Sequence, residues 1–190
     1  KLQRLRLSSI DCVEVDENFN EVLKDQRVMP HLHLSIQSGD DMILKRMKRR
    51  HNSKDVFQFV DRCKKIRKDI SFGADIIAGF PTETDTMFEN TYKLLRENEI
   101  SHLHIFPFSP KNNTPASRMP QVSKSIIKKR AKILRDLGEL ILKKVKSKLS
   151  LPREILIEEL NSGLAIGYDQ NYIKHKVPLV GVPVGEVIRV

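Results

Sequence analysis

Cysteine is scarce in this sequence, and its scarcity excludes several kinds of metal site. The 190 residues include two cysteines, Cys12 and Cys63, which lie far apart and share no spacing typical of metal ligands. Two thiols do not hold an iron–sulfur cluster, which usually takes three or four thiolates. We therefore interpret both as reduced structural thiols of a cytoplasmic protein.

Long apolar runs are also absent. No run approaches the roughly 18 residues that a membrane-spanning helix requires, so the sequence predicts no membrane partner. The first four residues, Lys-Leu-Gln-Arg, contain no apolar segment of the kind found in secretory signals. The chain begins without Met and within an expected strand, and we therefore expect it to be a piece of a longer protein.

Positive charge dominates what is present. The formal net charge is +10 and the sequence pI is about 9.7, with 39% apolar and 31% charged residues. A balance this basic is typical of a protein with a polyanionic partner such as nucleic acid or an anionic membrane surface, or of a basic protein from a lysine- and isoleucine-rich proteome. The charge alone does not decide between them. The length suffices for one domain, or for one domain with a small appendage.

The first two-thirds of the chain alternate between strand and helix patterns. Strands are expected at residues 4–10, 31–36, 72–79 and 103–108. Helices are expected at 19–23, at 41–47, from Ser53 onward and around 87–95, with Pro30 ending the first helical stretch and Ser53 capping the third. Connections of this length are typical of parallel crossovers. We therefore predict an α/β fold built from four βα-like units.

Two of the expected helices show an apolar face. The helix that follows Ser53 has its face on Val56, Phe57, Val60 and Ile66. A long helix from Ser123 to about Leu149 has one on Ile126, Ile133, Leu137, Leu140, Ile141, Val145 and Leu149. Basic residues crowd the opposite face of the long helix, namely Lys124, Lys128, Lys129, Arg130, Lys132, Arg135, Lys143, Lys144, Lys146 and Lys148. That face is typical of a solvated amphipathic helix, and it also suits contact with a phosphate backbone.

Beyond Pro152 the pattern changes to short strands separated by glycines. The strand-like runs are residues 154–159, 164–167, 172–176 and 186–190. This pattern predicts a small antiparallel β-module, whose last strand stops abruptly at Val190. We divide the chain into residues 1–150, which end with the long basic helix, and residues 151–190, which form the truncated module.

The segment from Gly73 to Thr84 is a buried strand that leads through a glycine turn into a helix. Gly79 lets a ligand approach the backbone closely because glycine has no Cβ. Thr82 or Thr84 is expected to cap the helix, and Glu83 suits its positive end. The pattern predicts either a ligand at the carboxyl end of a parallel strand or a purely structural turn.

Polar and aromatic residues recur where the expected strands end. They include Ser8, Ser9, Gln37, Ser38, Phe108 and Ser109. The carboxyl ends of parallel strands meet at one edge, and in (βα) barrels the chemistry takes place at that edge. This convergence predicts a binding site there more specifically than any single motif.

Two further groups have alternative interpretations. Residues 45–51, Lys-Arg-Met-Lys-Arg-Arg-His, form a basic cluster that suits either a carboxylate or phosphate ligand or a helix end rich in cations. His31 with His33, and His102 with His104, alternate on expected strands and have the residue type of metal ligands. Neither pair has a third ligand at hand in the sequence, so we assign no metal.

Several short segments follow one another in a characteristic order. They are Ser8-Ser9, 34–40, 47–51, 75–84, 108–110 and 114–116. Together they resemble the methylthiotransferase branch of the radical-SAM enzymes. Residues 31–41 and 106–121 are most similar to the MtaB type, which methylthiolates N6-threonylcarbamoyladenosine in tRNA. The resemblance covers about residues 2–122, and the end of the chain from about residue 153 more weakly resembles a TRAM module, a small β-barrel that binds tRNA.

This resemblance implies an incomplete (βα) radical-SAM barrel followed by a truncated TRAM-like β-module. Members of the family carry 4Fe–4S clusters, one of them on a C-x-x-x-C-x-x-C loop, and this sequence contains no cluster-binding segment. The resemblance also implies a pocket for S-adenosylmethionine, with Gln37 at the sugar or amino-acid portion and Ile77 along the adenine. The residues implied in that pocket are Ser8, Ser9, Gln37, Ser38, Arg50, Ile77, Gly79, Phe108 and Ser109.

The resemblance implies part of a tRNA methylthiotransferase that modifies C2 of N6-threonylcarbamoyladenosine at tRNA position 37. We expect the chain to be inactive alone, with tRNA as a partner and a separate polypeptide as a source of the missing half. The alternatives are a non-catalytic tRNA-binding fragment, a decayed remnant, or an enzyme acting on another substrate such as a ribosomal protein. One segment departs from the family, because Lys111-Asn112-Asn113 stands where an arginine and a glycine are usual.

Overall fold

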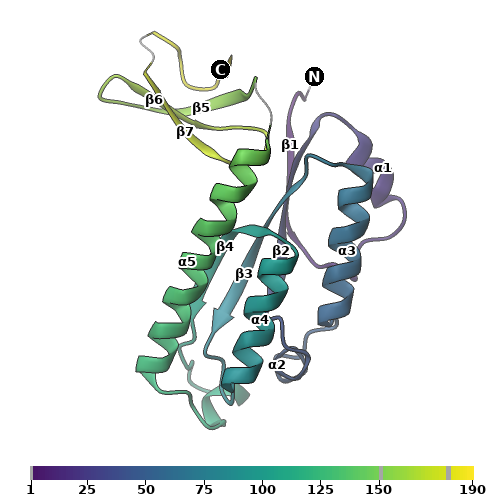
Figure 1. Cartoon of the computed structure of the whole chain (residues 1–190), viewed down its shortest axis with the longest axis vertical. Coiled ribbons are helices and arrows are strands. Elements are labelled where there is room, and N and C mark those ends of the chain that lie inside the picture. Colours follow the sequence, from purple (N-terminus) through teal and green to yellow (C-terminus); the bar gives the residue numbers. More distant parts are fainter. Residues whose placement is uncertain (1, 150–151, 179–180) are drawn as a thin grey trace.

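Four parallel strands form the main sheet, in the order β1-β2-β3-β4 (Figure 1). The structure is a computed structural model that describes residues 2–149, 152–178 and 181–190. The strands are β1 (Leu5–Ile10), β2 (Val28–Gln37), β3 (Ser71–Ala78) and β4 (Ile100–Pro107). The helices are α1 (Phe19–Lys24), α2 (Asp41–Arg46), α3 (Ser53–Ile66), α4 (Asp85–Glu97) and α5 (Lys124–Lys148), with a 3₁₀ turn at Pro115–Arg118. The predicted α/β fold with a parallel sheet is confirmed.

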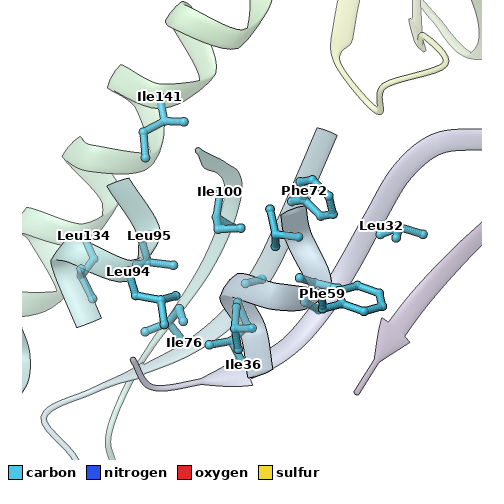
Figure 2. Packing of buried hydrophobic residues seen from close by; sticks show 14 of the residues in the cluster. Leu32, Ile36, Phe59, Phe72, Ile76, Leu94, Leu95, Ile100, Leu134 and Ile141 are labelled. Atoms are coloured by element: carbon cyan, nitrogen blue, oxygen red, sulfur yellow. The ribbon is translucent and has the colours of Figure 1, made fainter. Parts of the chain in front are cut away.

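The two faces of this sheet differ because side chains alternate along each strand. Leu32 and Ile36 of β2 and Phe72 and Ile76 of β3 are buried against the helices, where they meet Leu94 and other residues (Figure 2). The opposite face carries polar groups, among them His31, His33, Asp75, His102 and His104. The apolar face builds the core, and the polar face is left for other contacts.

Three local predictions about the first helices are wrong. Helix α1 ends at Lys24, so Pro30 does not end it and lies inside β2. Helix α3 is capped by Asn52, whose side chain accepts from the Asp55 amide in a reciprocal capping box. Phe57 is partly exposed, and Phe59 is buried in its place, because the buried face of α3 runs through Val56, Phe59, Val60 and Cys63.

The buried face of α5 also differs from the predicted one. Leu137 and Ile141 are buried as predicted, but Ile126 and Leu140 are 41% and 65% exposed. The face that packs on β4 is rotated and consists of Ile127, Arg130, Ala131, Leu134, Leu137, Gly138 and Ile141. Gly138 permits close packing, since a Cβ there would lie 3.2 Å from Leu103 Cδ1. Arg130, which the sequence places among the solvated cations, is buried.

The C-terminal residues form a second, antiparallel sheet with the order β7-β6-β5-β8. Its strands are β5 (Glu154–Asn161), β6 (Leu164–Tyr168), β7 (Lys174–Pro178) and β8 (Val187–Arg189), close to the four predicted runs. Ile155, Ile157 and Ala165 make its small core. The predicted boundary between residues 150 and 151 lies outside the described residues.

One loop of this second sheet closes the amino ends of the main-sheet strands. Asn171 Nδ2 donates to the backbone oxygens of Pro30 and Asp69, at 3.0 and 2.6 Å. Tyr172 stacks on His31 with ring centroids 5.4 Å apart, and Arg6 lies over the same tyrosine. Figure 1 shows the second sheet at the C-terminal end of α5, which lies beside the amino ends of the main-sheet strands and away from their carboxyl ends.

Burial under this loop keeps two histidines neutral. Burial lowers the pKa of His31 to about 2 and the pKa of His102 to about 4. Both rings therefore contribute to the packing of the fold and are not part of an exposed site.

Among the described helices, none combines the length and the apolar character needed to cross a bilayer.

A matched pair of substitutions tests the rotated face of α5. Leu134 is 1% exposed and Leu140 is 65% exposed on the same helix. We expect Leu134→Ala to lower the free energy of unfolding by about 2–5 kcal/mol through lost burial and a cavity. Leu140→Ala should change it by no more than about 0.5 kcal/mol. Urea denaturation measures both, and equal losses would contradict this packing.

A second prediction concerns pH. The folded pKa values of His31 and His102 lie below the unfolded value, so below pH 6.5 the unfolded chain binds protons that the folded chain does not. Stability is therefore fully present above pH 6.5 and falls as the pH decreases. Between pH 7.5 and 5.5 each histidine should remove roughly 1 kcal/mol. Denaturation of His102→Gln should show a smaller pH dependence than that of the parent chain; an unchanged pH dependence would refute the assignment.

Candidate functional site

A cleft lies where the main-sheet strands end. It has a volume of about 460 Å³. Its lining residues are Gln37, Asp75, Ile77, Phe106, Pro107, Phe108, Ser109, Lys111, Thr114 and Ala116. They come from the carboxyl ends of β2, β3 and β4 and from the loop that follows β4. The cleft therefore occupies the edge where the sequence predicts a binding site.

The backbone turns sharply where two strands end. Gln37 has φ 66° and Ser9 has φ 58°, both in the left-handed region that glycine favours. Each such residue costs of order 1 kcal/mol, and strain of this kind collects at functional sites. At the end of β2 the turn leaves Gln37 half-buried in the cleft, where its amide offers both a donor and an acceptor.

The turn after β3 is held by a buried network. Glu83 Oε2 accepts from the Gly79 amide at 3.0 Å and from Arg130 Nη1 at 2.7 Å. Thr84 caps α4, as predicted, by accepting from the Met87 amide. A Cβ at Gly79 would lie 2.4 Å from Ile127 Cγ1, so the space beside this glycine is filled by α5. Ile77, two residues earlier, lines the cleft instead.

The structure brings together four of the residues predicted for the pocket and separates the others. Gln37, Ile77, Phe108 and Ser109 line the cleft. The exposed Ser8 and Ser9 end β1 outside that lining, and Gly79 lies in the turn described above.

The last two predicted pocket residues make other contacts. Ser38 is buried, lies 3.3 Å from Thr91 Oγ1 and accepts from the Asp40 amide at 3.2 Å, which fixes the loop before α2. Arg50 is exposed and pairs with Glu14. Their roles toward a ligand remain predictions.

Two features of the cleft region were not predicted from the sequence. Asp75 lies on β3 between the two histidine-bearing strands, and its Oδ1 lies 2.9 Å from His33 Nε2 and 3.2 Å from His104 Nδ1. His51 of the basic cluster is buried, with Nε2 3.1 Å from the Ile36 oxygen. Sequence spacing reveals neither contact, since both join residues from separate elements.

The two thiols do not fit an iron–sulfur cluster. Burial raises the pKa of Cys12 and that of Cys63 to about 12, so neither is a ready thiolate. Cys63 lies in the hydrophobic core on α3. No other cysteine is present in the sequence.

The residues that line the cleft have the chemical character needed to bind S-adenosylmethionine. Ile77, Phe106 and Phe108 provide apolar walls of the kind that cover an adenine ring, and the Gln37 amide offers hydrogen bonds to a sugar or an amino acid. The turn at Gly79 holds the edge of β3 in place through Glu83.

Comparisons with known proteins agree with this fold. The family model of the Radical SAM superfamily matches residues 7–95. The "Threonylcarbamoyladenosine tRNA methylthiotransferase MtaB" of Rickettsia prowazekii is 51% identical over 93% of this chain and 42% of its own length. The protein of the same name from Thermotoga maritima is 41% identical over 96% of this chain and 43% of its own length. The chain thus spans less than half the length of these relatives.

A solved structure supports the fold alone. Coproporphyrinogen III oxidase (HemN) of Escherichia coli, described as a radical SAM enzyme, superposes with a TM-score of 0.57 at 18% identity. The likeness covers 71% of this chain and 32% of HemN. The family match and the two relatives show that the chain belongs to the radical-SAM superfamily, in the branch that contains the tRNA methylthiotransferases.

Proposed function

We propose that this chain is part of a tRNA methylthiotransferase that adds a methylthio group to C2 of N6-threonylcarbamoyladenosine at tRNA position 37. The strongest support is the 51% identity over 93% of the chain with a relative named for that reaction. A tRNA substrate places the reaction in the cytoplasm. The basic charge of the chain suits such a substrate.

The cleft supplies a place for S-adenosylmethionine, which brings radical and methyl-transfer chemistry to this family. Ile77 and Phe108 cover the adenine, and Gln37 orients the sugar or amino-acid portion through its amide. Ser109 adds a hydroxyl at the same edge. Four further residues of the implied pocket lie outside that lining, namely Ser8, Ser9, Ser38 and Arg50.

The thiolates that hold the cluster come from residues other than these 190, in the same polypeptide or in a partner polypeptide. Cys12 is half-buried and Cys63 is buried, and burial raises the pKa of both thiols. By itself, a polypeptide of this sequence therefore generates no radical. The same observation favours a second candidate, a tRNA-binding fragment that carries out no chemistry.

The helix α5 offers a surface for the tRNA backbone. Lys128, Lys129 and Lys132 are exposed on the side of α5 that faces away from the sheet. Lysines at phosphates release counterions, which makes such binding strongly salt-dependent. The second sheet lies at the C-terminal end of the same helix (Figure 1), and it would bind tRNA in the manner of a TRAM-like module.

A chimera tests the methylthiotransferase proposal. Residues 1–190 replace the matching segment of the Rickettsia relative, in a strain that lacks its own enzyme. Mass spectrometry of tRNA nucleosides should then detect methylthiolated threonylcarbamoyladenosine. The same chimera with Ile77→Asp should lose most of the product because a carboxylate is placed at the apolar wall, whereas Leu160→Asp, on exposed β5, should retain it.

The 190-residue chain alone is the negative control and should give neither product nor 5′-deoxyadenosine with S-adenosylmethionine and a reductant. A folded, cluster-loaded chimera without product would refute the proposal. Product from the isolated chain would refute its dependence on outside thiolates.

Salt dependence tests the tRNA surface separately. We expect Lys128→Ala with Lys129→Ala to weaken tRNA binding and to reduce the slope of log affinity against log salt by about 1–2. The control pair is Lys54→Ala with Lys93→Ala, which removes the same charge from exposed positions of α3 and α4. Filter binding between low and moderate salt measures both. Equal slopes for the two pairs would show that α5 is not the contact surface.

A further inference from the structure

Three side chains with metal-binding atoms meet on the polar face of the main sheet. They are His33 of β2, Asp75 of β3 and His104 of β4, from three neighbouring strands. Asp75 Oδ1 lies 2.9 Å from His33 Nε2 and 3.2 Å from His104 Nδ1. The three potential ligand atoms all lie within 4.8 Å of one another. Asp75 thus supplies the third ligand that the sequence leaves undetermined.

We propose that His33, Asp75 and His104 bind a divalent transition-metal ion of the zinc class. Ligand atoms around a tetrahedral zinc ion, at about 2.0–2.1 Å from it, stand about 3.3 Å from one another. The two measured separations are close to that value, so an ion enters with small side-chain movements. Two imidazoles and one carboxylate are a donor set that suits such ions.

The sheet is built to bring these groups together. Parallel pairing places Gly73 opposite His33 and Asp75 opposite His104. A Cβ at position 73 would lie 2.5 Å from His33 Nδ1 and 2.8 Å from the His102 oxygen. Glycine therefore leaves room for the His33 ring beside Asp75, and any larger residue would push that ring away.

The two contacts of Asp75 with His33 and His104 involve the same side-chain atoms that would bind the metal ion. In the metal-free chain Asp75 Oδ1 lies within hydrogen-bond distance of one nitrogen of each ring, and a ring with its N–H on that nitrogen donates a hydrogen bond to the carboxylate. A metal ion binds the lone pair of an imidazole nitrogen, so ligation requires the N–H of each ring to be on its other nitrogen.

The site keeps an open side. The His104 side chain is 59% exposed, and Asp75 also lines the cleft at the strand ends. Three protein ligands leave at least one position for water or for an oxygen of a bound molecule, as in catalytic zinc sites. The ion would therefore adjoin the cleft without depending on the proposed transferase function.

A second cluster provides a control. Asp11, Cys12 and His51 also bring potential ligand atoms within 4.8 Å of one another. Burial raises the pKa of Cys12 to about 12, which disfavours the thiolate that a metal needs. A metal ion bound by Asp11, Cys12 and His51 would have a sulfur ligand, whereas an ion bound at Asp75 would have none.

Cobalt(II) distinguishes the two clusters. The 190-residue chain, stripped of metal with a chelator, is titrated with Co²⁺ by visible absorption and calorimetry. We expect one ion per chain that Zn²⁺ displaces, with d–d bands and no sulfur-to-metal charge-transfer band. His104→Ala and Asp75→Asn should each weaken binding at least about tenfold, and Cys12→Ser should bind like the parent.

The variants are checked for folding by circular dichroism and thermal melting. The exposure of the His104 side chain makes His104→Ala the variant that keeps its fold. Two results would overturn the proposal. One is the absence of saturable binding to the folded parent chain. The other is binding that survives in folded His104→Ala and disappears in Cys12→Ser.

Discussion

The buried ion pair between Arg130 and Glu83 holds the functional edge of the main sheet together. Arg130 Nη1 lies 2.7 Å from Glu83 Oε2, and both residues are about 5% exposed. Burial raises the pKa of Glu83, whereas Arg130 and the Gly79 amide oppose that rise. Because the same carboxylate oxygen binds the backbone at Gly79, one contact joins α5 to the end of β3. Removing Arg130 would leave the Glu83 carboxylate buried without its partner, which typically costs about 3–5 kcal/mol.

Much of the fold follows from local pattern, whereas the packing of α5 does not. Strand alternation places all four parallel strands close to their observed positions, because a one-residue slip would turn every apolar side chain to the wrong face. The face of α5 cannot be found in this way. Arg130 looks like one more solvated cation, and its partner Glu83 lies 47 residues away. Gly138 contributes no apolar signal, although Leu103 packs closely against it.

In the candidate site, too, the residues at strand ends can be predicted from the sequence, whereas contacts between separate elements cannot. Gln37 and Phe108 follow from the rule that parallel strands end at one edge, and Ile77 follows from the family resemblance. All three line the cleft. Ser38 shares that position in the sequence, yet its hydroxyl contacts Thr91 on α4. The contact of Asp75 with two histidines depends on the register of three strands, which the residues of one strand do not specify.

Four histidines on one face of the sheet show how position along a strand decides chemistry. His31 and His102 lie near the amino ends, beneath Tyr172 of the second sheet, and burial keeps them neutral. His33 and His104 lie two residues further along, outside that cover, and share the carboxylate of Asp75. A shift of about 7 Å along a strand thus separates rings that stabilise the docking of the second sheet from rings that remain available to a ligand. The second sheet therefore closes one end of the polar face and leaves the other end, where the cleft lies, for binding.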